Sequence, residues 1–107
     1  MGWTFLTNYG HALIVLARNP QARVREVALA VGISDRAAQT ILNELVDAGY
    51  VTRERRGRRN RYILNTERPL RHPLEQQHAI GDLLRALGGF PAGGSSADPA
   101  PRPNASP

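Results

Sequence analysis

The chain has 107 residues, which favours one small domain and leaves little room for a second hydrophobic core. It contains no cysteine, so disulfide bonds and cysteine-ligated zinc sites are excluded. The formal net charge is +5 and all 14 basic residues are arginine, a balance that suits an anionic partner without identifying one. GC-rich codons would by themselves explain most of the preference for arginine over lysine.

The longest uninterrupted apolar run, Ala12–Ala17, is far too short to cross a bilayer. The first eight residues contain no basic leader, so no signal peptide is predicted. We therefore expect a cytoplasmic protein with no membrane partner.

Two short helices are predicted at the start of the chain. Thr7 is a suitable N-cap for a helix over 8–18, which Asn19-Pro20 ends. A short extended piece at 22–24 then precedes a second helix over 25–31. The side chains expected to form the buried stripe of the first helix are Leu13, Ile14, Leu16 and Ala17.

Residues 24–43 have the pattern of a helix-turn-helix. Ala28 stands where two helices must approach closely, and Gly32 stands where the chain must turn sharply. Ser34 is a suitable N-cap for a third helix that runs to Ala48 and ends at Gly49, a residue suited to a left-handed cap. The apolar side chains expected beneath the turn and along the third helix are Val27, Val31, Ile33, Ala38, Ile41, Leu42 and Leu45.

A basic β-hairpin is predicted next. Its strands would be 50–55 and 59–65, flanking a turn at Arg56-Gly57-Arg58. Val51, Tyr62 and Leu64 would anchor its base in the core. Arg53 and Arg55 share the alternation of Val51, but both faces of a projecting hairpin are wet, so we expect the tip to be an exposed arm.

A last helix is predicted over 74–87, after Pro69 and Pro73 break the chain. Its apolar stripe would consist of Leu74, Gln77, Ile80, Leu84 and Leu87, with Leu83 beside it. From Gly88 onward the composition is mostly Gly, Pro, Ser and Ala, which predicts a disordered tail over 88–107 after a domain over 1–87. The predicted fold class is therefore mainly α with a small β-hairpin wing, in the order α-α-α-β-β-α.

This order resembles that of bacterial winged helix-turn-helix transcriptional regulators, especially the MarR-like and ArsR-like groups. The residues that carry the likeness are Val27-Ala28, Val31–Ser34, Ile41–Leu45, Ala48–Val51 and Arg58–Tyr62. The likeness extends over residues 7–66, holds in outline for 67–87 and is absent from the tail. It implies a cytoplasmic protein on the nucleoid that binds double-stranded DNA. The longer N-terminal helical region of MarR-type regulators and the metal-binding cysteines of ArsR-type repressors are missing, so no residue supports a small-molecule effector, although one remains compatible with the family.

The third helix is the expected reading element, because the second helix of such a motif enters the DNA major groove. Gln39 and Asn43 are four residues apart and share one face, so both side chains can reach base edges. Arg36 suits a guanine or a phosphate. An ordinary solvated helix face is the alternative. The predicted DNA-binding residues of this helix are Ser34, Arg36, Gln39, Thr40 and Asn43.

The wing has the strongest charge signal in the chain. Its nine residues from 53 to 61 hold six arginines against Glu54 alone, and such mutual repulsion favours an external partner such as phosphate or an A·T-rich minor groove. Arg56 and Arg58 flank the tip and are the expected minor-groove residues, whereas Arg53 and Arg61 near the base are expected on backbone phosphate. A solubilising arm or an acidic protein partner is the alternative. The predicted DNA-binding residues of the wing are Arg53, Arg55, Arg56, Arg58, Arg59 and Arg61.

Apolar side chains at both ends of the domain predict a homodimer. They either pack together within one chain or meet across a two-fold axis, and we favour the dimer because a two-fold protein reads a pseudo-palindromic site. The residues expected in the dimer interface are Trp3, Phe5, Leu6, Ile80, Leu83, Leu84 and Leu87.

No catalytic, cofactor or metal site is predicted. Glu75, His78 and Asp82 are three and four residues apart, but on an exposed helix such a set is usually solvated. His11 and His72 have no serine–acid or cysteine partner arranged for catalysis, and no phosphate-binding glycine loop is present outside the tail. We therefore predict a DNA-binding transcriptional regulator, a repressor by family resemblance, and not an enzyme. A winged helix that binds an acidic protein partner and a non-specific architectural DNA binder are the alternatives.

Overall fold

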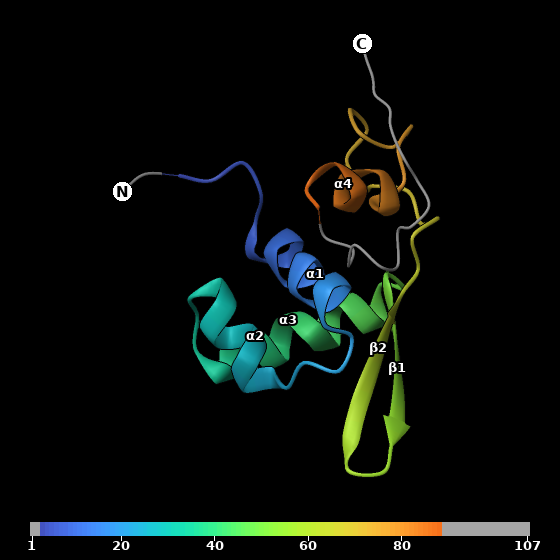
Figure 1. Ribbon diagram of the computed structural model, residues 1–107. Coiled ribbons are helices and arrows are strands. Elements are labelled where there is room, and N and C mark those ends of the chain that lie inside the picture. Colours follow the sequence, from blue (N-terminus) through green and yellow to red (C-terminus); the bar gives the residue numbers. More distant parts are fainter. Residues whose placement is uncertain (1–2, 89–107) are drawn as a thin grey trace.

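The computed structural model describes residues 3–88, which form four helices and a two-stranded antiparallel sheet (Figure 1). In chain order these elements are α1 (Asn8–Arg18), α2 (Val24–Val31), α3 (Asp35–Asp47), β1 (Val51–Arg56), β2 (Arg59–Leu64) and α4 (Ile80–Ala86). The predicted fold class, mainly α with a hairpin wing, is confirmed.

The helix-turn-helix forms where its end signals predict it. Gly32 follows α2 with φ +88°, and its N–H donates to the Ala28 carbonyl at 2.8 Å. The Ser34 hydroxyl accepts a hydrogen bond from the Ala37 N–H at 3.0 Å, which caps α3. At the other end of α3, Gly49 adopts φ +86° and starts the turn into β1. Because glycine adopts positive φ at low cost, both turns follow directly from the sequence.

A single apolar core joins all the helices to the base of the wing. α1 lies at its centre and packs against α2, α3, β2 and α4. Leu16, Val27, Leu42 and Leu84 are its largest fully buried side chains. Burying a side chain of this kind stabilises a fold by about 1.5–3 kcal/mol. The remaining buried side chains, in chain order, are Ala12, Leu13, Ala17, Ala22, Ala28, Ala38, Ile41, Leu45, Tyr50, Val51, Tyr62 and Ile80.

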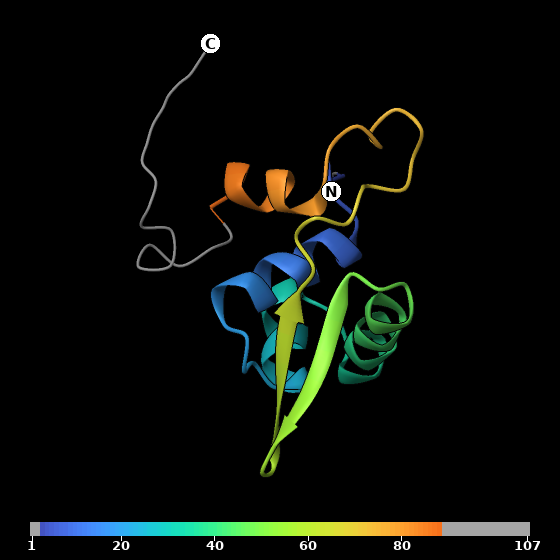
Figure 2. The same cartoon turned by 90° about the vertical axis from the view of Figure 1, so that its right-hand side faces the viewer.

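The wing is a regular hairpin whose tip projects beyond the helices (Figure 2). The strand register pairs Val51 with Leu64 and Arg56 with Arg59, so the turn contains only Gly57 and Arg58. Gly57 adopts φ +61°, as a tight two-residue turn requires. The turn is thus one residue shorter than predicted, because Arg56 still pairs in the ladder.

A backbone hydrogen bond attaches the wing to the loop after α1. The Tyr62 N–H donates to the Pro20 carbonyl at 2.8 Å. The predicted extended piece at 22–24 is confirmed only at Arg23, which has extended backbone angles (φ −83°, ψ 159°); no strand forms there, and Val24 already belongs to α2. The Arg23 N–H instead donates to the Glu26 carboxylate at 2.7 Å, which fixes the first turn of α2.

The last helix is shorter than predicted and begins at Ile80 instead of residue 74. The segment before it folds back on itself: Pro69 and Ala79 form an isolated antiparallel bridge, and the Leu70 N–H donates to the His78 carbonyl at 2.9 Å. The Ile80 N–H also donates to the Arg68 carbonyl, at 2.8 Å. These backbone bonds are incompatible with helical bonds over the same residues, so Leu74 is left 89% exposed and does not belong to a buried stripe.

Among residues 3–88, no helix is long and apolar enough to cross a membrane. The predicted tail over 88–107 falls outside the described residues except for Gly88.

Candidate nucleic-acid interface

α3 has one buried face and one exposed polar face. Ala38, Ile41, Leu42 and Leu45 are buried, as the helical spacing predicts. Four of the predicted DNA-binding side chains lie exposed on the other face, and these are Arg36, Gln39, Thr40 and Asn43. Ser34 is exposed too, but its hydroxyl is occupied as the N-cap. The helix therefore presents a row of amide, hydroxyl and guanidinium groups to solvent.

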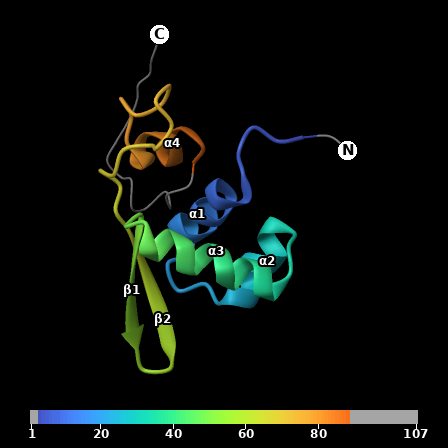
Figure 3. The ribbon, with the colours of Figure 1, turned by 180° about the vertical axis from the view of Figure 1, so that it is seen from behind.

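The polar face of α3 is connected to the wing. The Arg53 Nη2 donates to the Asn43 Oδ1 at 2.7 Å, and the Gln39 Nε2 donates to the same oxygen at 3.1 Å. Thr40 is engaged within the helix, because its hydroxyl donates to the Arg36 carbonyl at 3.1 Å. Figure 3 shows β1 starting beside the end of α3, which brings the two elements within side-chain reach.

Arg53 is turned toward the body of the protein. Its guanidinium carbon lies 5.8 Å from the centre of the Tyr62 ring, within the range of a cation–π contact. Its Nε is buried and has no hydrogen-bond partner among residues 3–88. We expected both faces of the hairpin to be solvated beyond its base, and this is wrong at Arg53. The side chain of Arg53 points to the same side of the hairpin as the buried Val51, as their alternation predicts.

The arginines nearer the tip are exposed. These are Arg55, Arg56, Arg58 and Arg59. Arg55 Nε donates to the Gly57 carbonyl at 2.8 Å, and Arg59 Nη2 donates to the Gln21 carbonyl at 3.0 Å. Glu54 offsets part of the charge, with its Oε1 3.5 Å from the Arg56 Nη2. Arg61, directly opposite Glu54 in the ladder, is half-buried. The distal hairpin thus presents several cations around one partly neutralising acid.

A hydrogen bond that the sequence did not predict joins α3 to α1. The Tyr9 hydroxyl of α1 donates to the Glu44 carboxylate of α3. This hydrogen bond, together with partial loss of hydration and the charge of Glu44, raises the pKa of Tyr9 above its ordinary value. The partners are 35 residues apart, so no local sequence signal links them.

Beside this contact lies an open groove of about 900 Å³ between the first turn of α1, the end of α3 and the segment before α4. Its lining includes Phe5, Leu6, Leu70 and Leu83. Phe5 is 92% exposed and Trp3 is 76% exposed, and their rings meet edge to face with centroids 4.8 Å apart. Large aromatic side chains in water are unfavourable, so this region is suited to a contact with another molecule.

The residues expected in a dimer interface fall into three groups by their exposure. Ile80 and Leu84 are 4% and 0% exposed within one chain, so their assignment to the interface is wrong for this conformation. They pack against the core because α4 lies on α1. Leu6 and Leu83 are half-buried. Trp3, Phe5 and Leu87 remain exposed and available to a second copy.

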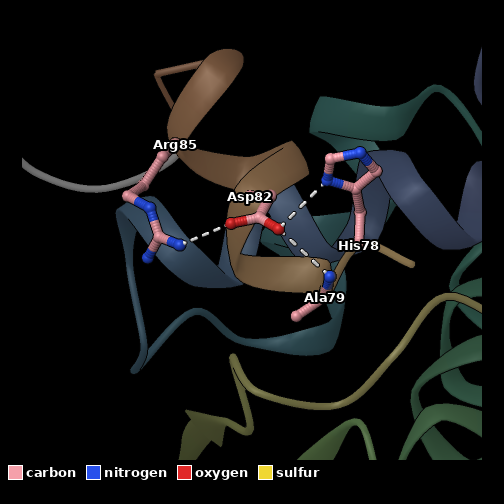
Figure 4. Close-up of polar contacts among 4 residues, drawn as sticks. All are labelled: His78, Ala79, Asp82 and Arg85. Atoms are coloured by element: carbon pink, nitrogen blue, oxygen red, sulfur yellow. Dashed lines mark hydrogen bonds and ion pairs between the residues drawn. The ribbon is translucent and has the colours of Figure 1, made fainter. Parts of the chain in front are cut away.

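A cluster of hydrogen bonds around Asp82 joins the start of α4 to the residues just before it (Figure 4). Asp82 accepts from the Ala79 N–H at 3.2 Å and from Arg85 Nη2 at 2.9 Å, and its Oδ2 lies 3.4 Å from His78 Nδ1. The bond from Ala79, followed by those from Arg85 and His78, outweighs burial and lowers the pKa of Asp82. Glu75 and His78 precede the helix, and residues 3–88 contain no group of three acidic, histidine or cysteine side chains that could hold a metal ion.

The comparison with known families agrees with this geometry. The MarR family model matches residues 6–61, a span of 56 of the 107 residues that begins just before α1 and ends within β2. No curated protein matches the chain. The matched span contains the helix-turn-helix, the polar face of α3 and the six arginines of the wing. The chain therefore belongs to the MarR family of transcriptional regulators and has the winged-helix DNA-binding domain of that family.

Proposed function

We propose that this regulator binds specific double-stranded DNA sequences, with α3 in the major groove and the wing on the backbone and adjacent minor groove. The observation that carries the proposal is the direct bond between the two elements, from Arg53 Nη2 of β1 to Asn43 Oδ1 of α3. It sets the exposed amides of α3 beside the exposed arginines of the hairpin. One DNA duplex can then meet both elements at once.

The two elements divide the work of recognition. The neutral amides Gln39 and Asn43 suit base edges, whose hydrogen-bonding patterns differ from one base pair to the next in the major groove. The wing arginines suit phosphate, whose charge is the same at every base pair. Arg56 and Arg58 lie on either side of the tip and are the side chains proposed to enter the minor groove. Specificity would thus come from α3 and most of the affinity from the wing.

We further propose that the protein acts as a homodimeric repressor on DNA of the cytoplasmic nucleoid. Two exposed aromatic side chains support a contact between copies: Phe5, which lines the groove, and Trp3, whose ring packs on that of Phe5. A two-fold pair of winged helices reads inverted half-sites, and tethering two weak reading units makes the second binding event intramolecular. Occupation of a promoter would then exclude polymerase, and the proposed sign of regulation rests on the resemblance to repressors of this family.

Selection from a random duplex library at moderate salt tests this proposal. We expect the retained pool to be enriched in one motif with two inverted half-sites, whose spacing reports the dimer geometry. Retention without an enriched motif would favour a non-specific architectural role, in which charge alone drives binding. No retention would contradict DNA binding by this domain and favour an acidic protein partner for the wing.

A further inference from the structure

We infer that Arg53 is a positioning residue that fixes the Asn43 carboxamide, so that Asn43 presents only hydrogen-bond donors to DNA and selects guanine. The inference rests on the proposed function and specifies which base edge the same surface reads. The contacts between β1 and α3 carry it.

The orientation of the Asn43 amide follows from the chemistry of its neighbour. A guanidinium has only donors, so the Asn43 atom 2.7 Å from Arg53 Nη2 must be the carbonyl oxygen. The Gln39 atom 3.1 Å from the same oxygen must then be its amide nitrogen. Both amides are therefore oriented without ambiguity, although an asparagine or glutamine alone can be turned either way.

Arg53 is itself held firmly enough to impose this orientation. The register places it directly opposite Tyr62, a side chain only 2% exposed, and its guanidinium lies over that ring. Its Nε is buried. These contacts hold the guanidinium so that its Nη2 meets Asn43 of α3.

The consequence is a defined set of free groups on the reading face. The Asn43 oxygen already accepts two hydrogen bonds, which leaves the two N–H donors of Nδ2. Gln39 keeps its Oε1 acceptor and the second N–H of Nε2, so it still offers one acceptor and one donor. Asn43 and Gln39 have the same functional group, but in the folded protein they offer different hydrogen-bonding atoms to a partner.

The free groups predict different bases. Guanine presents two acceptors, N7 and O6, in the major groove, whereas adenine presents the N7 acceptor beside the N6 amino donor. A donor-only Asn43 matches guanine, and its N–H groups would face the adenine amino group unfavourably. Gln39 retains the acceptor–donor pair that matches adenine. We thus expect guanine at the Asn43 position and adenine at the Gln39 position of each half-site.

The test is random-duplex selection with variants matched in charge. Asn43→Ala identifies the motif position that Asn43 reads, because preference is lost there. Arg53→Ala frees the amide to turn, and we expect the guanine-to-adenine ratio at that position to fall about tenfold. Arg55→Ala is the control: it removes the same charge from the same strand and face, but within residues 3–88 the Arg55 side chain hydrogen-bonds only the Gly57 carbonyl. It should weaken binding without changing that ratio.

Circular dichroism monitors whether Arg53→Ala folds. A second variant, Asn43→Asp, makes the test independent of that outcome. In Asn43→Asp one carboxylate oxygen still accepts from Arg53, and the other presents an acceptor to DNA. We expect preference at this position to move from guanine to cytosine, whose N4 amino group donates. A motif in which Arg53→Ala keeps the guanine ratio, or Asn43→Asp keeps guanine, would overturn the inference and leave specific binding intact. Absence of any motif for the native protein would overturn the proposed function and this inference with it.

Discussion

At Gly81 the backbone of α4 lies so close to Thr66 that a side chain has no room. The Gly81 N–H donates to the Thr66 carbonyl at 2.9 Å. A Cβ at Gly81 would stand 2.8 Å from the Thr66 Cβ and 2.9 Å from its carbonyl oxygen. Neither group is the end of a flexible side chain, so α4 would have to move. We expect Gly81→Ala to lower the free energy of unfolding by about 1–3 kcal/mol, measured by urea denaturation.

Gly10→Ala is the matched control for this substitution. A Cβ there would meet the Leu6 side chain, at 3.2 Å, and alanine in the first turn of α1 improves helix propensity by up to about 1 kcal/mol. We expect a smaller change than at Gly81, with the same measurement. Equal losses in both variants would show that the approach to Thr66 is not what requires glycine.

The polar face of α3 shows how much the sequence reveals about single side chains. The exposure of Gln39 and Asn43 was predictable because helical spacing alone decides which side chains oppose Ile41 and Leu45. The orientation of their amides was not. It depends on Arg53, ten residues beyond Asn43 and in another element, and that contact exists only once β1 is placed against α3.

At the scale of the elements, the excess positive charge of the wing predicts how strongly DNA binding depends on salt concentration. Arg56 and Arg58 are exposed at the tip, and each phosphate contact releases condensed counterions when DNA binds. For Arg56→Ala combined with Arg58→Ala, we expect weaker binding to all sequences alike. The slope of log affinity against log salt should flatten by about 1–2, measured by fluorescence anisotropy.

Arg18→Ala combined with Arg71→Ala serves as the control, since it removes two exposed arginines outside the wing and changes the net charge equally. This pair should leave the slope nearly unchanged. If both pairs flatten the slope to the same extent, net charge and not the wing determines the salt dependence.

Local sequence signals define the bounds of α1 and α3, but they do not define where α4 begins. α1 has the predicted bounds, and α3 ends within a residue of them, because Ser34 and Gly49 mark its ends. α4 was predicted too long because the apolar spacing continues back to Leu74. Nothing in that spacing shows that Leu70 pairs with His78, a backbone contact that prevents an earlier helical turn.

The short α4 depends on Asp82, and this gives it an expected pH dependence. Hydrogen bonds from Ala79, Arg85 and His78 lower the pKa of Asp82 in the folded state. The contribution of Asp82 to stability is therefore complete above its unfolded pKa of about 4, and it is lost as the pH falls through the lower folded pKa. Because the side chain is 47% exposed, we expect less than about 1 kcal/mol.

Asp82→Asn isolates this contribution, because the amide cannot titrate. In thermal denaturation between pH 6 and pH 2, roughly the range in which Asp titrates, the native protein should lose more stability on acidification than the variant. Parallel pH profiles for the two proteins would show that the Asp82 bonds do not stabilise the charged form.

For the whole molecule, one core connects the polar face of α3, proposed to bind DNA, to the exposed aromatic residues near the N-terminus. α1 packs against α3 on one side and α4 on another, and the Tyr9–Glu44 bond links the first turn of α1 to the end of α3. A second copy that engages Trp3 and Phe5 would therefore hold the two reading helices at a fixed separation. The sequence indicated apolar side chains at both ends of the domain. It did not indicate which of them are exposed, because only the packing shows that Ile80 and Leu84 are already buried.

Oligomeric state tests this arrangement directly. We expect the native protein to sediment as a dimer at micromolar concentration, and Trp3→Ser combined with Phe5→Ser to sediment as a monomer, since the substitutions remove two exposed aromatic anchors. Leu29→Ser is the control: Leu29 is 72% exposed on α2, outside the proposed interface, and its loss should leave the dimer intact. The monomeric variant should still bind a single half-site but lose the tighter binding to inverted pairs. A variant that remains dimeric would place the contact between copies elsewhere on the surface, and the half-site spacing would then report a different geometry.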